Sequence, residues 1–211
     1  MNGPSLMKQN KGLRNSSAES IVDWAVSQGG SPIATTSMGP HSAVLLHLVS
    51  LRAPDTPVVW VDTGYNSTET YVVAEQLIAL LSLDVRVYTS IITTSRRKAL
   101  AYQLPGIEDV EERANFTQEV KLEPFERALS ELQPSLWLTG IRREETEFRR
   151  GLDVLSPGPD GITKVAPLFY WSVDEVEQYI GRHSLPACRS YFDPTKIQEN
   201  LECGLHRAMG G

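Results

Sequence analysis

With 211 residues, of which 41% are hydrophobic and 22% are charged, the chain is long enough for one domain with a full core. We find no run of about 18 apolar residues and no basic, apolar leader, so we expect neither a membrane span nor a secretory signal. The net charge of -6 argues against a general nucleic-acid-binding face, because such a face needs a basic excess. The two cysteines are too few for a disulfide framework, and a free thiol implies a reducing compartment, so we expect a cytoplasmic protein.

The order of apolar and polar stretches predicts most of the secondary structure. Residues 1–15 are polar without periodicity and are predicted to form a flexible lead. Ser16 and Glu19 fit a capping box, which starts a helix that Gly29 and Gly30 end. Short apolar runs between turn residues predict strands at 32–36, 57–61, 85–88, 136–139, 154–155 and 163–166. Amphipathic or apolar stretches predict helices at 42–51, 71–81, 116–132 and 172–181.

Two polar stretches between these elements are predicted to lie at the surface, with a ligand role as the alternative for the first of them. Arg96, Arg97 and Lys98 form a basic run, and a run of this kind is usually a solvated face. Residues 105–115 are acidic and are predicted to form a surface loop.

The segment between the first strand and the next helix is a candidate anion site. Ser37, Gly39 and Ser42 lie in or beside a small-residue loop that leads into a helix. A strand, such a loop and a helix present backbone N–H groups and a helix N-terminus to a phosphate or sulfate. The alternative is a plain tight turn, since any strand-to-helix turn favours Ser and Gly.

Further candidates follow two other strands, at the edge where ligands collect in an open parallel sheet. Asp62, Thr63, Gly64 and Tyr65 follow the second strand; the alternative for them is helix capping and ring packing. Arg142 and Arg143 follow the strand at 136–139, and the planar donor fork of arginine suits phosphate and sulfate oxygens. The alternative for these arginines is an exposed patch of ion pairs with the neighbouring glutamates.

The run 202–206 places a cysteine near the end of the chain. Only the thiolate of Cys203 is a nucleophile, and the neighbouring His206 and Arg207 would favour that form by stabilising its negative charge. Two alternatives remain open. A lone cysteine is often a small buried apolar residue. The chain also supplies a zinc-like set of two histidines and two cysteines, without the usual closely spaced cysteine pair: His183, Cys188, Cys203 and His206.

Resemblance to a known family favours the catalytic interpretation. Glu202-Cys203-Gly204-Leu205-His206 looks like the Glu-Cys-Gly-Leu-His tail of the thioredoxin-dependent phosphoadenylyl sulfate (PAPS) reductases. Other stretches resemble that family in the same order along the chain. They are 37–42, similar to its modified PP-loop; 62–65 with 69–70; 121–127; 140–145; 164–171; and 179–186.

The resemblance implies a fold and a set of site residues. We expect a single doubly wound α/β domain of the adenine nucleotide alpha-hydrolase type, with a mostly parallel sheet and helices on both faces, spanning 16–186. A mobile tail, 187–211, would follow it. The resemblance implies that Cys203 is the nucleophile, with Glu202 and His206 tuning the thiol or docking the tail. The substrate-binding residues would be Ser37, Gly39, Ser42, Asp62, Thr63, Gly64, Tyr65, Lys121, Arg142, Arg143 and Lys164.

The same resemblance implies a reaction and partners. The enzyme would be a homodimer that reduces PAPS to sulfite in sulfate assimilation, with thioredoxin or glutaredoxin as reductant. Related adenylyl sulfate reductases hold an iron-sulfur cluster on paired cysteines, which residues 115–117 and the isolated Cys188 do not supply, so we expect no cluster and no metal. The segment 187–200 is shorter than in the family, and Pro40 and His41 depart from its loop. The alternatives are a cluster-free adenylyl sulfate reductase and a nucleotide-binding protein that has lost the chemistry.

Overall fold

The computed structural model describes residues 3–100, 103–106 and 108–196. Six strands form one sheet in the order β3-β2-β1-β4-β6-β5. All neighbouring strands are parallel except β5 and β6, which are antiparallel. The strands are β1 (Pro32–Thr36), β2 (Val58–Asp62), β3 (Val85–Thr89), β4 (Leu136–Leu138), β5 (Leu155–Pro157) and β6 (Thr163–Val165). Each lies within about two residues of a predicted strand.

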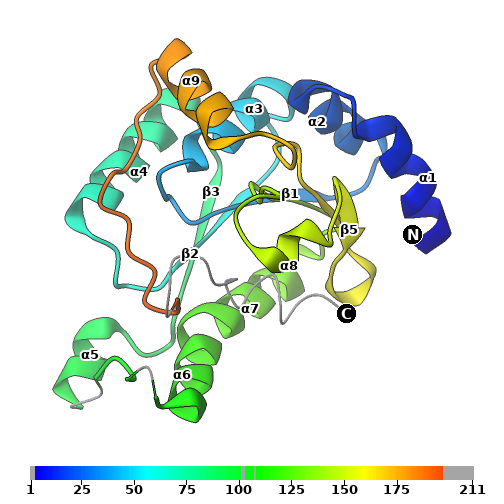
Figure 1. Ribbon diagram of the computed structural model, residues 1–211. Helices are drawn as coiled ribbons and strands as arrows, with labels where there is room; N and C mark the ends of the chain where they lie inside the picture. Colours follow the sequence, from blue (N-terminus) through cyan, green and yellow to red (C-terminus); the bar gives the residue numbers. More distant parts are fainter. Residues whose placement is uncertain (1–2, 101–102, 107, 197–211) are drawn as a thin grey trace.

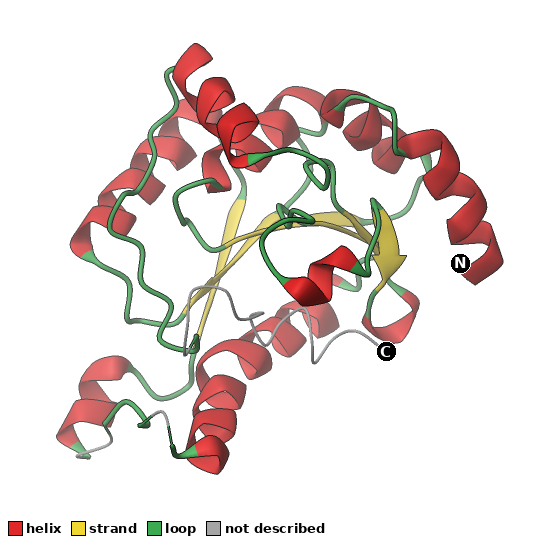
Figure 2. Cartoon of the chain, viewed as in Figure 1, coloured by secondary structure: helices red, strands yellow, loops and turns green. Residues whose placement is uncertain are grey.

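Helices cover both faces of this sheet, so the predicted doubly wound architecture is confirmed (Figures 1 and 2). On one side lie α1 (Gly3–Leu13), α2 (Ala18–Ser27), α3 (Ser42–Arg52), α4 (Thr68–Leu81) and α9 (Val173–Arg182). On the other side lie α6 (Val110–Thr117), a π-helical turn η1 (Gln118–Leu122) and α7 (Glu123–Leu132). Three short helices complete the described chain: α5 (Thr94–Ala99), α8 (Glu147–Arg150) and the 3-10 turn η2 (Pro159–Gly161). Among the described residues, none of the helices is long and apolar enough to cross a membrane.

The core has one part on each face of the sheet. Helix α3 lies between the sheet and the outer helices, which is why it buries residues around most of its circumference, including Val44, Leu46 and Leu48. On the opposite face, Phe125 of α7 packs against Trp137 of β4, with ring centroids 4.8 Å apart. Both side chains are fully buried, and they lie under the edge of the sheet that carries the candidate site.

The N-terminal segment is helical, so the prediction of a flexible lead over 1–15 is wrong for its described part. Leu6, Asn10 and Leu13 lie on one face of α1 and are buried. The Asn10 amide donates to the Leu155 carbonyl (2.9 Å) and accepts from the Leu155 N–H (2.8 Å). These bonds satisfy the backbone of the edge strand β5. The buried face of α1 was not predicted from sequence because Asn10, between Leu6 and Leu13, is polar.

Replacing Asn10 by Ala is therefore expected to lower the free energy of unfolding by about 2 kcal/mol, because it leaves two buried backbone groups of Leu155 without their partner. Urea denaturation followed by circular dichroism measures this loss. Lys11→Ala, on the exposed face of the same helix, is the control and should change stability by less than about 0.5 kcal/mol. Equal stability of the two variants would show that the hydrogen bonds of Asn10 to Leu155 contribute little to stability.

Two other local predictions need correction. The N-cap of α2 is Ser17, whose side chain accepts from the Ser20 N–H, and not Ser16 paired with Glu19. Part of the predicted loop 105–115 belongs to α6, whose first turn carries two glutamates that suit a helix N-terminus. The predicted helix 116–132 is helical along its length, and its regular bonding is interrupted by η1 directly before Pro124, in the first turn of α7. Proline has no N–H to donate to the regular α-helical hydrogen bond, so the backbone hydrogen-bond pattern changes from α-helical to π-helical in the turn before Pro124.

Candidate active site

The candidate site lies at the carboxyl ends of β1 and β2, on the face covered by α7. The strand order reverses between β1 and β4, and crevices at such reversal points are where open α/β sheets bind ligands. The pocket found there has a volume of about 40 Å³. It is lined by Thr35, Thr36, Ser37, Val59, Val61, Thr63, Asn66, Lys121, Phe125, Tyr191, Phe192, Asp193 and Pro194.

The predicted anion loop follows β1 directly. Met38 adopts a left-handed backbone (φ 52°), and its N–H donates to the Thr36 hydroxyl at 3.0 Å. Ser37 then faces the pocket, while Ser42 opens α3. A Cβ on Gly39 would lie 3.4 Å from the nearest ring carbon of Tyr191, so the ring rests on the loop. The loop therefore has the predicted strand-turn-helix form, with an aromatic side chain covering its glycine.

The stretch after β2 forms a tight turn organised by Asp62. Its carboxylate accepts from the Gly64 N–H (2.9 Å), the Asn66 amide (2.8 Å) and the Tyr71 hydroxyl (3.0 Å). Burial, together with the nearby negative charge of Asp62, raises the pKa of Tyr71 to about 12. Gly64 needs its glycine, because its φ is 75° and a Cβ would lie 2.4 Å from the Thr94 hydroxyl oxygen. Asp62 thus shapes the turn.

The side chains of the turn after β2 lie in different surroundings. Thr63 lines the pocket. Tyr65 packs edge-to-face on Phe116, with ring centroids 5.6 Å apart, and burial raises its pKa. Asn66 also lines the pocket and was not predicted from sequence. Asparagine is a common residue in turns, so no sequence signal separated Asn66, four residues after the end of β2, from its neighbours.

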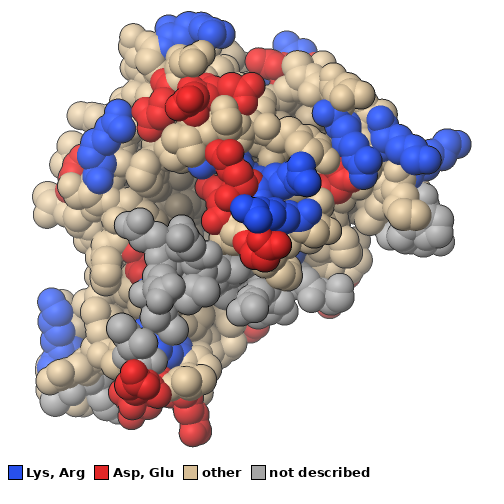
Figure 3. Space-filling view, in the orientation of Figure 1, with Lys and Arg blue, Asp and Glu red and all other residues tan. Residues whose placement is uncertain are grey.

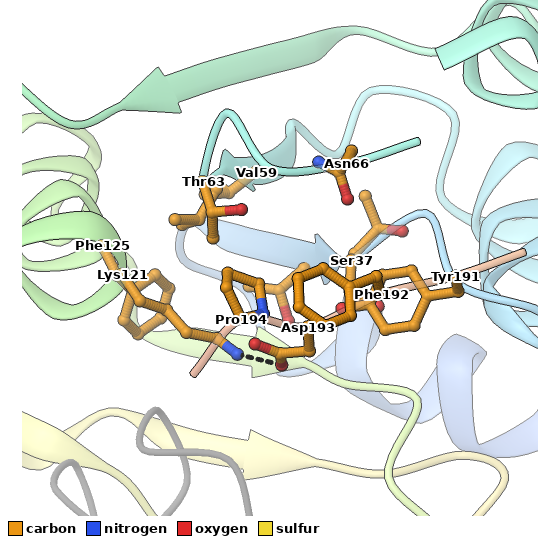
Figure 4. A pocket seen from close by; sticks show the side chains of 13 residues that line it. Ser37, Val59, Thr63, Asn66, Lys121, Phe125, Tyr191, Phe192, Asp193 and Pro194 are labelled. Carbon is orange, nitrogen blue, oxygen red and sulfur yellow. Dashed lines mark hydrogen bonds and ion pairs between the residues drawn. The ribbon is translucent and has the colours of Figure 1, made fainter. Parts of the chain in front are cut away.

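Lys121 is the buried cation of the pocket. Its ammonium donates to the Asp193 carboxylate at 2.6 Å and to the Thr195 hydroxyl at 3.2 Å. Only 8% of the lysine side chain and 5% of the aspartate side chain are exposed. Burial by itself would raise the pKa of Asp193, but the charge and hydrogen bond of Lys121, with the Thr195 hydroxyl and N–H, outweigh it and lower the pKa. Figure 4 shows the two groups facing each other at the end of the pocket.

The remaining predicted cations lie outside this lining. The Arg142 guanidinium, 3% exposed, is bonded to Glu145 (3.2 Å) and to His41 Nδ1 (3.2 Å). Arg143 instead faces a second, more open hollow that also contains Arg150 and Tyr170. Lys164 is buried, with its ammonium 5.0 Å from the centre of the Trp137 ring. The structure therefore brings Ser37, Thr63 and Lys121 together and holds Arg142, Arg143 and Lys164 in separate surroundings.

The predicted catalytic residues Glu202, Cys203 and His206 lie outside the described residues. Cys188 is buried, with its sulfur 3.3 Å from the Thr70 hydroxyl. His183 packs against the rings of Tyr179 and His47. In the part of the chain that the structure describes, no three His, Cys, Asp or Glu side chains are placed to hold a metal ion.

Charge on the face shown in Figure 3 is mixed: the described basic side chains there lie beside acidic ones.

Arg97, which the sequence placed on a solvated face, is 6% exposed. It pairs with Glu119 and lies 5.3 Å from the centre of the Phe116 ring. The prediction of a solvated face therefore holds for Arg96 and Lys98, which are exposed, and is wrong for Arg97, whose charge is covered by Glu119 and the Phe116 ring.

Comparison with known proteins identifies the family. The profile of the phosphoadenosine phosphosulfate reductase domain matches residues 31–194 of this chain. The chain belongs to this family. A phosphoadenosine 5'-phosphosulfate reductase of Synechococcus sp. is 40% identical over 184 residues, which cover 87% of this chain and 79% of the relative. The corresponding reductase of Synechocystis sp. is 39% identical over 175 residues, covering 82% of this chain and 70% of the relative.

Solved structures agree on the fold. The crystal structure of a phosphoadenylyl-sulfate reductase from Candida auris, a phosphate complex, has a TM-score of 0.78 and 23% sequence identity to this chain. The match covers 89% of this chain and 90% of that one. The predicted membership of the reductase family is therefore confirmed, together with its α/β fold.

Proposed function

We propose that this protein reduces phosphoadenylyl sulfate to sulfite and adenosine 3',5'-bisphosphate, as a step of sulfate assimilation. The observation that carries the proposal is its membership of a family whose members at 39–40% identity are named for this reaction. The charge and the hydrogen-bond donors at this edge of the sheet suit the anionic groups of a nucleotide. A backbone loop and the start of α3 lie at the strand ends, and the buried Lys121 faces the same pocket.

The chemical step that we propose is nucleophilic. The Cys203 thiolate attacks the sulfur of the bound sulfonucleotide, the sulfur–oxygen bond to the phosphate breaks, and adenosine bisphosphate leaves. The product on the protein is S-sulfocysteine. Lys121 and the N–H groups at the start of α3 would offset negative charge on the leaving phosphate. Glu202 and His206 would tune the thiol or dock the segment that carries it.

A dithiol partner would complete the reaction. One thiolate of thioredoxin or glutaredoxin attacks the cysteine sulfur of the adduct, releases sulfite and forms a mixed disulfide. Its second thiol then resolves that disulfide, so the partner loses two electrons and Cys203 is regenerated. We propose that this happens in the cytoplasm, in a homodimer and without an iron-sulfur cluster. The sequence contains two cysteines, fewer than the four thiolates that hold such a cluster.

Intact-protein mass spectrometry tests the proposal. The reduced protein, incubated with phosphoadenylyl sulfate and no reductant, is expected to gain the mass of one sulfonate, which the Cys203→Ser protein does not gain. Adding reduced thioredoxin should remove that mass and release sulfite. A parallel incubation uses adenylyl sulfate. An adduct formed only with adenylyl sulfate would contradict the proposed substrate, and no adduct with either compound would contradict the proposed reaction.

A further inference from the structure

The segment Arg189–Thr195, here called the strap, lies across the candidate active site. It follows α9, runs past α4 and reaches the sheet edge near β2 and α7 (Figure 1). Four of its residues, Tyr191 to Pro194, line the pocket and lie along one side of it in Figure 4. With the strap in place the pocket volume is about 40 Å³, whereas ligand pockets usually span roughly 300–1,000 Å³. An adenine nucleotide therefore does not fit while the strap holds this position.

The strap is fastened at both ends. At its start, the Arg189 N–H donates to the Glu69 carboxylate of α4 at 3.0 Å. At its far end, Asp193 meets Lys121, and the Thr195 hydroxyl and N–H bond to the second oxygen of the same aspartate at 2.6 and 3.0 Å. A turn of the strap thus presents one carboxylate oxygen to the lysine. Between the two ends, the Tyr191 ring rests on Gly39 of the predicted anion loop.

Asp193 is placed as an anionic ligand would be. A carboxylate oxygen 2.6 Å from a buried ammonium has the charge and distance of a phosphate or sulfate oxygen in the same contact. Both side chains are more than nine-tenths buried, so water screens this pair little. Any anion that uses Lys121 has to share it with Asp193 or displace it, and two anions on one buried lysine repel each other.

We propose that Asp193 is an affinity-setting residue: it pairs with Lys121 in this structure and yields that lysine to an anionic group of the nucleotide. The inference rests on the proposed function for the identity of the ligand. Binding then requires the strap to open, and the apparent affinity is lowered by the fraction of molecules in which it is closed.

Calorimetric titration with adenosine 3',5'-bisphosphate tests this role. Asp193→Asn keeps the shape of the side chain but removes its charge, and it is expected to bind the nucleotide about tenfold more tightly than the wild type. Lys121→Met should bind it more weakly. In the double variant Asp193→Asn, Lys121→Met, the gain should vanish, because the aspartate acts through the lysine. A residue that only supports the fold would weaken binding when replaced, so the sign of the change separates the two roles.

Two further variants accompany this test, one as a negative control and one as a weaker change to the same contact. Asp23→Asn removes a carboxylate that pairs with Arg52, about half exposed, between α2 and α3, and it should leave the affinity unchanged. Thr195→Val keeps both charges but removes the hydroxyl that orients Asp193, so it should give a smaller gain than Asp193→Asn. Unchanged or weaker binding by both strap variants, with native circular dichroism, would overturn the proposal.

Repeating the titrations with ATP and adenosine 5'-phosphate separates this inference from the proposed function. If the wild type does not bind the bisphosphate but Asp193→Asn gains affinity for another anionic nucleotide, the proposed reaction fails and the role of Asp193 stands. If the bisphosphate binds and no nucleotide binds Asp193→Asn more tightly, the role of Asp193 fails and the proposed reaction stands.

Discussion

Sulfite formation from phosphoadenylyl sulfate is expected to fall at least about 1,000-fold when Cys203 is replaced by Ser, because a hydroxyl near neutral pH supplies almost no anionic nucleophile. His206 and Arg207, which are close in sequence, would favour a thiolate by their positive charge, but they would not bring the pKa of a hydroxyl into the same range. Release of sulfite with reduced thioredoxin in excess measures the loss. Nucleotide binding should remain within about threefold, since the change affects the reacting atom alone.

The chain offers a matched control for this substitution, because it contains one other cysteine. Cys188 is fully buried and contacts the Thr70 hydroxyl at 3.3 Å, so its sulfur acts as a small packing group. Cys188→Ser is expected to keep activity within about tenfold of the wild type. If the Cys188→Ser protein were inactive and the Cys203→Ser protein active, the assignment of Cys203 as the nucleophile would be wrong.

The strands could be predicted from sequence because each is a short apolar run between turn residues. β1 was predicted with its observed bounds, and the polar residues after β1 and β2 were predicted to share one edge because parallel strands place their carboxyl ends together. In the structure, Ser37 and Thr63 line the same pocket at this edge, as predicted. The place of this pocket at the sheet edge could therefore be predicted before any contact was known.

The features that were missed depend on contacts between distant parts of the chain. Asp193 is a single acidic residue followed by proline, and nothing local indicates that it reaches Lys121, 2.6 Å away in space. Lys121 was named from the family resemblance, but the π-helical turn from which it lines the pocket was not predicted, because the hydrogen bonds of such a turn have no periodic signature in sequence. Arg142 has the charge expected of a ligand contact, but His41 and the neighbouring glutamates surround its guanidinium.

Replacing Trp137 by Ala is expected to have the largest effect on stability, a loss of about 4 kcal/mol in the free energy of unfolding. Trp137 is fully buried in the face of the sheet below the pocket. Its indole N–H donates to the Thr35 hydroxyl at 2.8 Å, and its ring packs on Phe125. Alanine would leave a cavity and remove the ring that lies 5.0 Å from the Lys164 ammonium. Urea denaturation at neutral pH measures the loss.

Trp137→Phe separates packing from the polar contacts of the same side chain. Phenylalanine keeps an aromatic ring against Phe125 and beside Lys164 but removes the donor to Thr35, so we expect a loss of about 1–2 kcal/mol. Because Thr35 lines the pocket, this variant should also weaken nucleotide binding modestly, while its fold remains native. If Trp137→Ala and Trp137→Phe lost the same stability, the hydrogen bond to Thr35 and not the buried ring would be the main contribution, and the core below the site would tolerate a smaller residue.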